Sequence, residues 1–161
     1  MYKRALIPLD GSSVAEAIIP FIVDIAGPLD MEVVLLQVVE PIAPQVLEGS
    51  RHVEVEDVEA RRANAEEYLA AIAVELRNKA VRVQSQVRRG IPADEIVAGA
   101  REAGADLIAM STHGRSGLGR LVFGSVAQAV LRHVDTPVLL LRATEAQMAK
   151  RVTSKPAPKR G

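Results

Sequence analysis

The chain has 161 residues, which is enough for one domain with a substantial buried core. Hydrophobic residues make up 48% of the sequence but aromatic residues only 2%, so the core has to be built from aliphatic side chains. Lys plus Arg and Asp plus Glu number 20 each, which leaves no net charge to attract nucleic acid or an anionic membrane. Cysteine is absent, which excludes disulfides, thiol catalysis and Cys-ligated zinc.

No apolar run of the sequence approaches the roughly 20 residues that a membrane span needs. Residues 1–4 lead directly into a strand-like run, without the long apolar segment and the small-residue cleavage site of a secretory signal. We therefore expect a cytoplasmic protein with no membrane or nucleic-acid partner.

The first part of the chain predicts a strand followed by a helix. Residues 5–9 form a short apolar run, which is typical of a strand buried on both faces. The capping-box spacing Ser13-x-x-Glu16 predicts the start of an amphipathic helix that runs to about residue 25. A Gly-Pro pair at 27–28 then ends this helix.

The middle of the chain continues this alternation. The apolar residues 32–39 predict a second buried strand, and a loop is expected from there to about residue 52. Apolar side chains recur at helical spacing over 54–77, which predicts a long helix. Residues 81–87 alternate apolar and polar side chains, as expected of a strand at the edge of a sheet.

Two further helices and two further strands are predicted. A helix is expected over 92–104, because proline suits its first turn, and a buried strand follows at 107–110. Residues 111–124 are rich in Gly, Ser, Thr and Arg and predict a loop. The spacing Ser-x-x-Gln at 125–128 is a second capping box that opens a helix to about residue 133, and the last strand is predicted at 138–141.

Residues 144–161 differ from the domain at 1–143. They carry Lys and Arg with no acidic residue after Glu145, and they include two prolines. Such a segment cannot bury a core of its own, so we expect a disordered tail. It can serve as a basic arm for an acidic partner or simply be solvated, and the sequence leaves both interpretations open.

Alternating strands and helices predict an α/β fold, in which one open parallel sheet of five strands carries helices on both faces. Ligands of such sheets bind beyond the carboxyl ends of the strands, where the strand order reverses. This rule places Asp10 and Ser111, which end the first and fourth strands, at the expected site.

The loop from Ser111 to Ser125 is the segment that most favours phosphate binding. Its glycines allow backbone N–H groups to approach a phosphate without a side chain in the way. Ser125 and the amides after it would lie at a helix N-terminus, which favours an anion, and Arg115 and Arg120 add positive charge. A triphosphate fits these features, although the same composition also suits a plain turn before a helix.

Two better-known phosphate motifs do not match this loop. Residues 114–121 approach the P-loop pattern, but Arg120 and Leu121 stand where its Lys and Ser/Thr are required. The Rossmann pattern G-x-G-x-x-G fails because Val122 stands at its third glycine. A P-loop ATPase and a dinucleotide enzyme are therefore excluded.

Several separated motifs of residues 2–142 resemble the universal stress protein family. The family's opening Pro-x-Asp-Gly-Ser is present at 8–12, and the closing Thr-Pro-Val is present at 136–138. Its ATP signature, G-x-x-G-x(9)-G-[ST], is matched by Gly114 and by Gly-Ser at 124–125, with Ser111 in place of the first glycine. The resemblance implies a Rossmann-like fold of the adenine nucleotide alpha hydrolase type, with strand order 3-2-1-4-5.

The resemblance also implies an ATP site and roles for its residues. Asp10 would contact the ribose hydroxyls or the adenine edge, and His113 would touch a phosphate or magnesium unless it is a plain surface residue. Val38 and Met110 would flank the base and ribose, although core packing alone also explains them. The twelve implied site residues are Pro8, Leu9, Asp10, Val38, Met110, Ser111, His113, Gly114, Arg115, Gly124, Ser125 and Val126.

The expected function is that of a binding module rather than an enzyme. The sequence lacks G-x-S-x-G and H-E-x-x-H motifs, and no carboxylate is clearly placed to activate water. We expect a stress-response regulator that binds ATP, with or without Mg²⁺, and forms a homodimer through the apolar strand Val138–Leu141, as the family resemblance implies. The alternatives are an interaction protein of the same fold that needs no nucleotide, and a slow ATP hydrolase.

Overall fold

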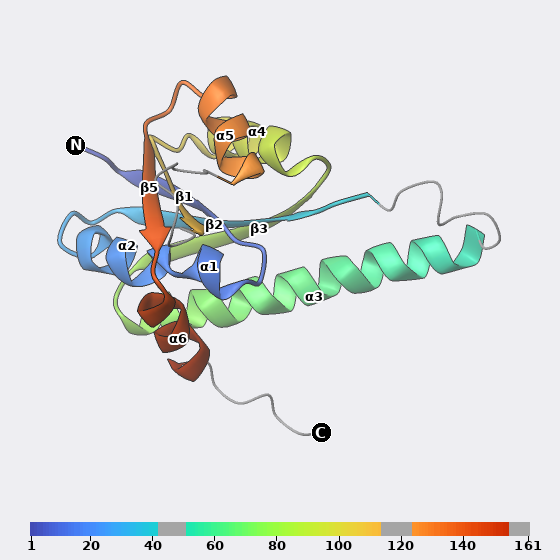
Figure 1. Ribbon diagram of the computed structural model, residues 1–161, viewed down its shortest axis with the longest axis horizontal. Helices are drawn as coiled ribbons and strands as arrows, with labels where there is room; N and C mark the ends of the chain where they lie inside the picture. Colours follow the sequence, from blue (N-terminus) through green and yellow to red (C-terminus); the bar gives the residue numbers. More distant parts are fainter. Residues whose placement is uncertain (42–50, 114–123, 155–161) are drawn as a thin grey trace.

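The computed structural model describes residues 1–41, 51–113 and 124–154, with side chains described over 1–41, 57–113 and 124–152. Five parallel strands form one sheet in the order β3-β2-β1-β4-β5, which confirms the expected order (Figure 1). The strands are β1 (Arg4–Pro8), β2 (Glu32–Val39), β3 (Arg82–Arg89), β4 (Leu107–His113) and β5 (Val138–Ala143). The helices are α1 (Ser13–Glu16), α2 (Ile18–Ala26), α3 (Arg51–Asn78), α4 (Pro92–Ala103), α5 (Ser125–His133) and α6 (Glu145–Ser154).

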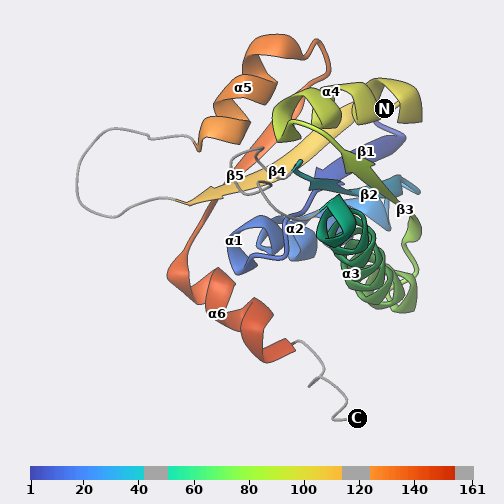
Figure 2. The same ribbon diagram turned by 90° about the vertical axis from the view of Figure 1, so that its right-hand side faces the viewer.

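The sheet is covered on both faces by helices, as predicted. Helices α1, α2 and α3 cover one face and α4 and α5 cover the other (Figure 2). Successive residues of β1 alternate between the two layers: Ile7 packs on the α2 and α3 side and Leu6 on the α4 and α5 side. Because both side chains are fully buried, β1 is the centre of both cores.

Two predicted capping boxes are wrong. The first helix is capped by Ser12, whose Oγ accepts a hydrogen bond from the Ala15 amide at 3.1 Å, so the helix begins at Ser13, one residue earlier than a cap at Ser13 would place it. The carboxylate of Glu16 is buried and bonded elsewhere instead of closing a box. At α5 the N-cap is Gly124, which has no side chain to form a cap, so Ser125 is the first helical residue.

The fourth strand is longer than predicted. Pairing of β4 with β5 continues through Ser111↔Leu141 to His113↔Ala143, so residues 111–113 belong to the sheet and not to the loop. The edge position predicted for the third strand is confirmed, because β3 is the outermost strand on its side.

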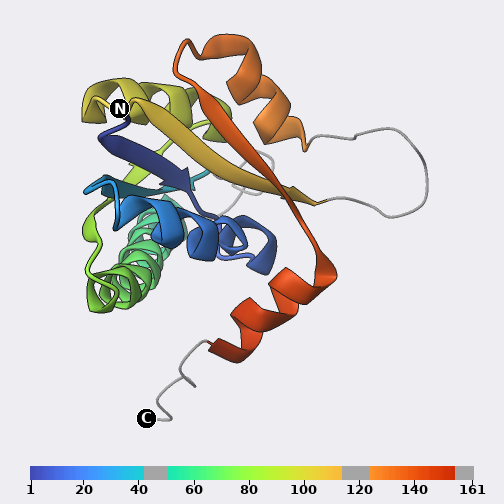
Figure 3. The same ribbon diagram turned by 90° about the vertical axis from the view of Figure 1, so that its left-hand side faces the viewer.

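The prediction of a disordered tail over residues 144–161 is wrong for its first part. Residues Glu145–Ser154 form helix α6 rather than a disordered segment, and α6 packs against α1 (Figure 3). The reason is a long-range contact, since Arg151 of α6 is buried against two carboxylates of the domain. The remaining tail residues, 155–161, lie outside the described part of the chain.

None of the helices in the described part of the chain combines the length and the apolar character that crossing a lipid bilayer requires.

The start of β1 is tied to the start of β4 by the side chain of Asp106. Its carboxylate accepts hydrogen bonds from the backbone amides of Lys3, at 2.8 Å, and Arg4, at 3.0 Å. Although partial burial acts to raise the pKa of Asp106, these two hydrogen bonds hold it below its ordinary value. The carboxylate therefore stabilises the fold in its charged form.

Replacing Asp106 with Asn should destabilise the protein by about 1–2 kcal/mol at pH 7, because the amide accepts one of the two hydrogen bonds but places a donor against the other. A depressed folded-state pKa contributes stability that is present above the ordinary value of 3.8 and is lost as the pH falls through the folded-state value. Urea unfolding of both proteins at pH 7 and near pH 3 measures the loss of stability and its dependence on pH. A difference between wild type and Asp106→Asn that stays constant with pH would contradict this role of the carboxylate.

Candidate functional site

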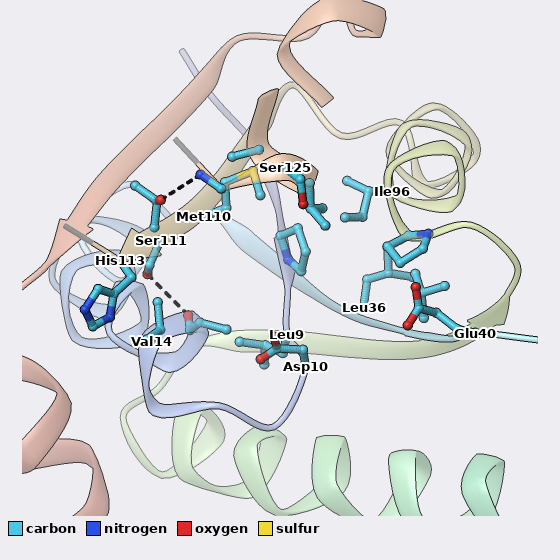
Figure 4. A pocket seen from close by; sticks show the side chains of 18 residues that line it. Leu9, Asp10, Val14, Leu36, Glu40, Ile96, Met110, Ser111, His113 and Ser125 are labelled. Carbon is cyan, nitrogen blue, oxygen red and sulfur yellow. Dashed lines mark hydrogen bonds between the residues drawn. The ribbon is translucent and has the colours of Figure 1, made fainter. Parts of the chain in front are cut away.

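A cavity of about 380 Å³ opens at the carboxyl ends of β1 and β4, where the strand order reverses. Its volume lies within the usual range for small-molecule sites, which is roughly 300–1,000 Å³. The walls come from the ends of β1, β2 and β4 and from the first residues of α1, α4 and α5 (Figure 4). The fold thus gathers segments that are far apart in the sequence around one space.

Every predicted site residue in the described part of the chain lines this cavity. These residues are Pro8, Leu9, Asp10, Val38, Met110, Ser111, His113, Gly124, Ser125 and Val126. Gly114 and Arg115 lie outside the described residues. The cavity is also lined by residues that the sequence did not single out, namely Val14, Ala15, Leu36, Glu40, Pro92, Ile96, Thr112 and Ala127.

Asp10 is held beyond the carboxyl end of β1 by a tight turn. Its Oδ1 accepts a hydrogen bond from the Ser12 amide at 2.9 Å, and Gly11 has φ of +85°, a left-handed conformation that favours glycine. Just before the turn, the Leu9 amide donates to the carbonyl of Leu36 at 2.8 Å, which extends the pairing of β1 beyond Pro8. This turn fixes the Asp10 carboxylate at the cavity rather than leaving it on a mobile loop.

The N-terminus of α5 forms the opposite wall of the cavity. In Figure 4, Asp10 and Ser125 lie on opposite sides of the space. The first amides of a helix have no partners within the helix and carry the positive end of its dipole. Gly124 presents its backbone to the cavity without a side chain, and Ser125 is exposed at the first position of the helix. An anionic group is the ligand that such a wall favours.

Two hydroxyl groups at the end of β4 have different hydrogen-bond partners. The Ser111 hydroxyl donates to the carbonyl of Ala15 at 3.3 Å, which links β4 to α1. Thr112 Oγ1 instead accepts a hydrogen bond from the Gly124 amide at 3.2 Å, which links β4 to α5. A hydroxyl that accepts a hydrogen bond still has its own proton to donate. Thr112 is therefore the better-placed donor for a ligand oxygen, although the sequence pointed to Ser111.

The ionisable side chains of the described lining are two carboxylates and a histidine. Asp10 and Glu40 follow β1 and β2, and His113 ends β4. The same rule that selected Asp10, a carboxylate directly after a buried strand, also applies to Glu40, so the sequence carried a signal for it. No group of three or more His, Asp or Glu side chains within the described ranges is arranged to hold a metal ion.

Comparison with known proteins identifies relatives along most of the chain. The model of the universal stress protein family matches residues 1–142. The universal stress protein MJ0531 of Methanocaldococcus jannaschii is 34% identical over 144 residues, which cover 88% of this chain and 83% of that protein.

Solved structures show the same fold. The structure of MJ0577, from the same archaeon, superposes with a TM-score of 0.76 at 29% identity and covers 90% of this chain and 99% of that one. The structure of the universal stress protein UspA from Lactobacillus plantarum superposes with a TM-score of 0.71 at 25% identity, covering 88% of this chain and 98% of that one. With the sheet order, the cavity and these matches in agreement, the chain belongs to the universal stress protein family.

Proposed function

We propose that this protein binds an adenine nucleotide, with ATP as the main ligand, in the cavity between β1, β4 and α5. It acts in the cytoplasm as a dimeric stress-response module whose surface or stability changes with nucleotide occupancy. The observation that carries this proposal is the pairing, across one cavity, of a fixed carboxylate with a helix N-terminus. A ligand that has hydroxyl donors at one end and phosphates at the other suits both walls.

The walls near Asp10 suit the nucleoside. Asp10 accepts one hydrogen bond from its own turn and offers its second carboxylate oxygen to ribose hydroxyls. Pro8, Leu9 and Val38 give apolar surface for the base, and Met110, which is buried, packs beneath the ribose or base. Glu40, at the end of β2, can accept a hydrogen bond from the exocyclic amino group of adenine.

The walls near α5 suit the phosphates. The amides of Ser125 and Val126 and the Ser125 hydroxyl bind phosphate oxygens, and Gly124 leaves room for them to approach. Gly114 and Arg115 complete this side in the proposal, and His113 touches a phosphate or the Mg²⁺ that accompanies ATP. Two proteins of the same fold support the ligand class: one universal stress protein has been solved with cAMP, and one from Archaeoglobus fulgidus with dAMP.

Calorimetric titration of ATP and AMP, with and without Mg²⁺, tests the proposal. We expect micromolar binding of ATP, equivalent to about −8 kcal/mol, and loss of that binding in Gly124→Val and Asp10→Ala. Gly124 has φ of −57°, and a Cβ there would meet Thr112 Oγ1 at 3.8 Å, an ordinary contact. The variant should therefore fold, so that lost binding reports an obstructed phosphate wall.

Three outcomes separate the competing functions. Wild-type protein that neither binds adenine nucleotide nor retains it through purification would contradict the proposal and favour an interaction protein of the same fold. Steady release of phosphate well above the slow background of bound ATP, abolished by Asp10→Ala, would indicate a hydrolase instead. Binding without turnover supports the sensor.

Ser111→Gly restores the glycine of the family signature and should leave the dissociation constant for ATP unchanged, because the Ser111 hydroxyl is turned toward Ala15 and not toward the phosphate wall. The variant should lose about 1 kcal/mol of stability, since the half-buried carbonyl of Ala15 loses its donor. Thr112→Val is the matched comparison, and we expect it to weaken ATP binding. Tighter binding in Ser111→Gly would show that the serine side chain obstructs the ligand.

The homodimer is proposed to form through β5. This strand lies at one edge of the sheet, and its side chains Val138 to Leu141 remain only half-buried in the single chain. An apolar edge strand with unpaired backbone groups favours pairing with a second chain.

Light scattering of the purified protein should give the mass of two chains, and Leu140→Lys should convert it to one chain by placing a charge on that edge. Val74→Lys, at an exposed apolar position of α3, is the control and should remain dimeric. Circular dichroism shows whether both variants keep the fold. A wild-type mass of one chain at micromolar concentration would contradict the dimer.

A further inference from the structure

Helix α6 is attached to the domain by a buried arginine. Arg151 Nε donates to Glu16 Oε2 at 3.2 Å, and its two terminal nitrogens donate to the carboxylate oxygens of Glu75 at 2.7 and 3.0 Å. The side chain of Arg151 is 4% exposed and that of Glu16 is 0% exposed. Buried charges of this kind are costly to separate, because either one alone would stay desolvated.

Tyr68 of α3 completes the cluster around Glu16. Its hydroxyl donates to Glu16 Oε1 at 2.8 Å, so each oxygen of this carboxylate has a partner. Burial, followed by the hydrogen bond to Glu16 and the nearby charges of Glu16 and Asp10, raises the pKa of Tyr68 well above its ordinary value. The hydroxyl therefore remains a donor.

The same short helix carries both the buried carboxylate and a wall of the cavity. Val14 and Ala15 of α1 line the cavity, and the Ala15 carbonyl accepts the Ser111 hydroxyl. Glu16 is the next residue along the chain. Helix α1 has four residues, too few to be stable without tertiary contacts. Its position therefore depends on tertiary contacts, and the contacts of Glu16 with Tyr68 and Arg151 are among them.

We propose that α6 is a positioning element for the nucleotide cavity, and that Arg151 is the positioning residue that holds α1 in place through Glu16. The inference rests on the proposed function, because it concerns the affinity of that cavity. Helix α6 lies beyond residues 1–142, the part matched by the family model, so this contact is added to the family domain.

Docking of α6 and binding of nucleotide are then coupled, and the coupling is reciprocal. If docked α6 raises the affinity for ATP by a given factor, bound ATP strengthens the docking of α6 by the same factor. Couplings of this type are commonly about 5- to 150-fold. The two halves of this relation can be measured separately, one by titration and one by hydrogen exchange of the α6 amides.

The test compares Arg151→Met, Arg151→Lys and Glu75→Gln with a matched control. Arg62→Met removes another Arg–Glu pair of the domain, but there the side chains of Arg62 and Glu66 are 60% and 56% exposed, so little should change. Each variant is titrated with ATP at a temperature where circular dichroism shows it folded. Glu75→Gln, which leaves the Glu16 contact intact, serves if Arg151→Met fails to fold.

We expect ATP to bind about tenfold more weakly to Arg151→Met, less weakly to Glu75→Gln, and normally to Arg62→Met. Arg151→Lys should recover part of the loss, because it restores the charge but not the two-pronged contact with Glu75. In the wild type, saturating ATP should slow hydrogen exchange in α6 by a similar factor. A purely structural role would lower the melting temperature of Arg151→Met but leave the dissociation constant of its folded form unchanged.

Two results would overturn the inference while leaving the proposed function in place: an unchanged ATP affinity in folded Arg151→Met, or α6 exchange that does not respond to ATP in a wild type that binds it. Absence of ATP and AMP binding in the wild type would instead overturn the proposed function, and the coupling with it. The titration of the wild type therefore distinguishes the two failures.

Discussion

The pairing of β1 with both β2 and β4 is the constraint on which the rest of the structure depends. Ala5 and Leu6 face Val33 and Val34 on one side and Leu107 and Ile108 on the other, and all six side chains are buried. From this central position the chain leaves β1 toward α1 on one face, and it leaves β4 toward α5 on the other face. The two exits diverge, and the cavity lies between them. If the strand order did not reverse here, the connections after neighbouring strands would lie on the same face of the sheet, and no crevice would open between them.

The cavity is consequently built of parts that are held by different means. The turn at Asp10 is local, since its own side chain and Gly11 define it. The α5 wall is held to β4 through Thr112 and Gly124, which lie twelve residues apart. The α1 wall is too short to hold itself and is fixed by distant partners on α3 and α6. The walls of the cavity therefore differ in the sequence separation between each wall and the residues that hold it in place.

This difference explains which features could be predicted from the sequence. Strand order, the five strands, Asp10 and the residues at 124–126 follow from periodicity, from family motifs and from the rule about strand ends. Ser12 rather than Ser13 caps α1, because the cap is decided by backbone conformation within one residue, which a spacing pattern does not resolve. Val14, Pro92 and Ile96 line the cavity only because separate helices begin beside it. Helix α6 was missed because composition alone, rich in Lys and Arg, does not reveal that one arginine has a buried partner elsewhere.

The contact between Glu16 and Arg151 joins positions 135 residues apart, and this separation has a consequence for how the protein folds during synthesis. The ribosome releases α1 long before Arg151 exists, so the nascent chain must carry the Glu16 carboxylate without its guanidinium partner through the making of every later strand. A carboxylate in that state is costly to bury, so the apolar layer of α2 and α3 packs around it less stably than in the complete chain. The full stability of that layer is thus reached only after translation has passed Arg151 and the chain has left the exit tunnel. The distant arginine makes completion of the domain a late and cooperative step.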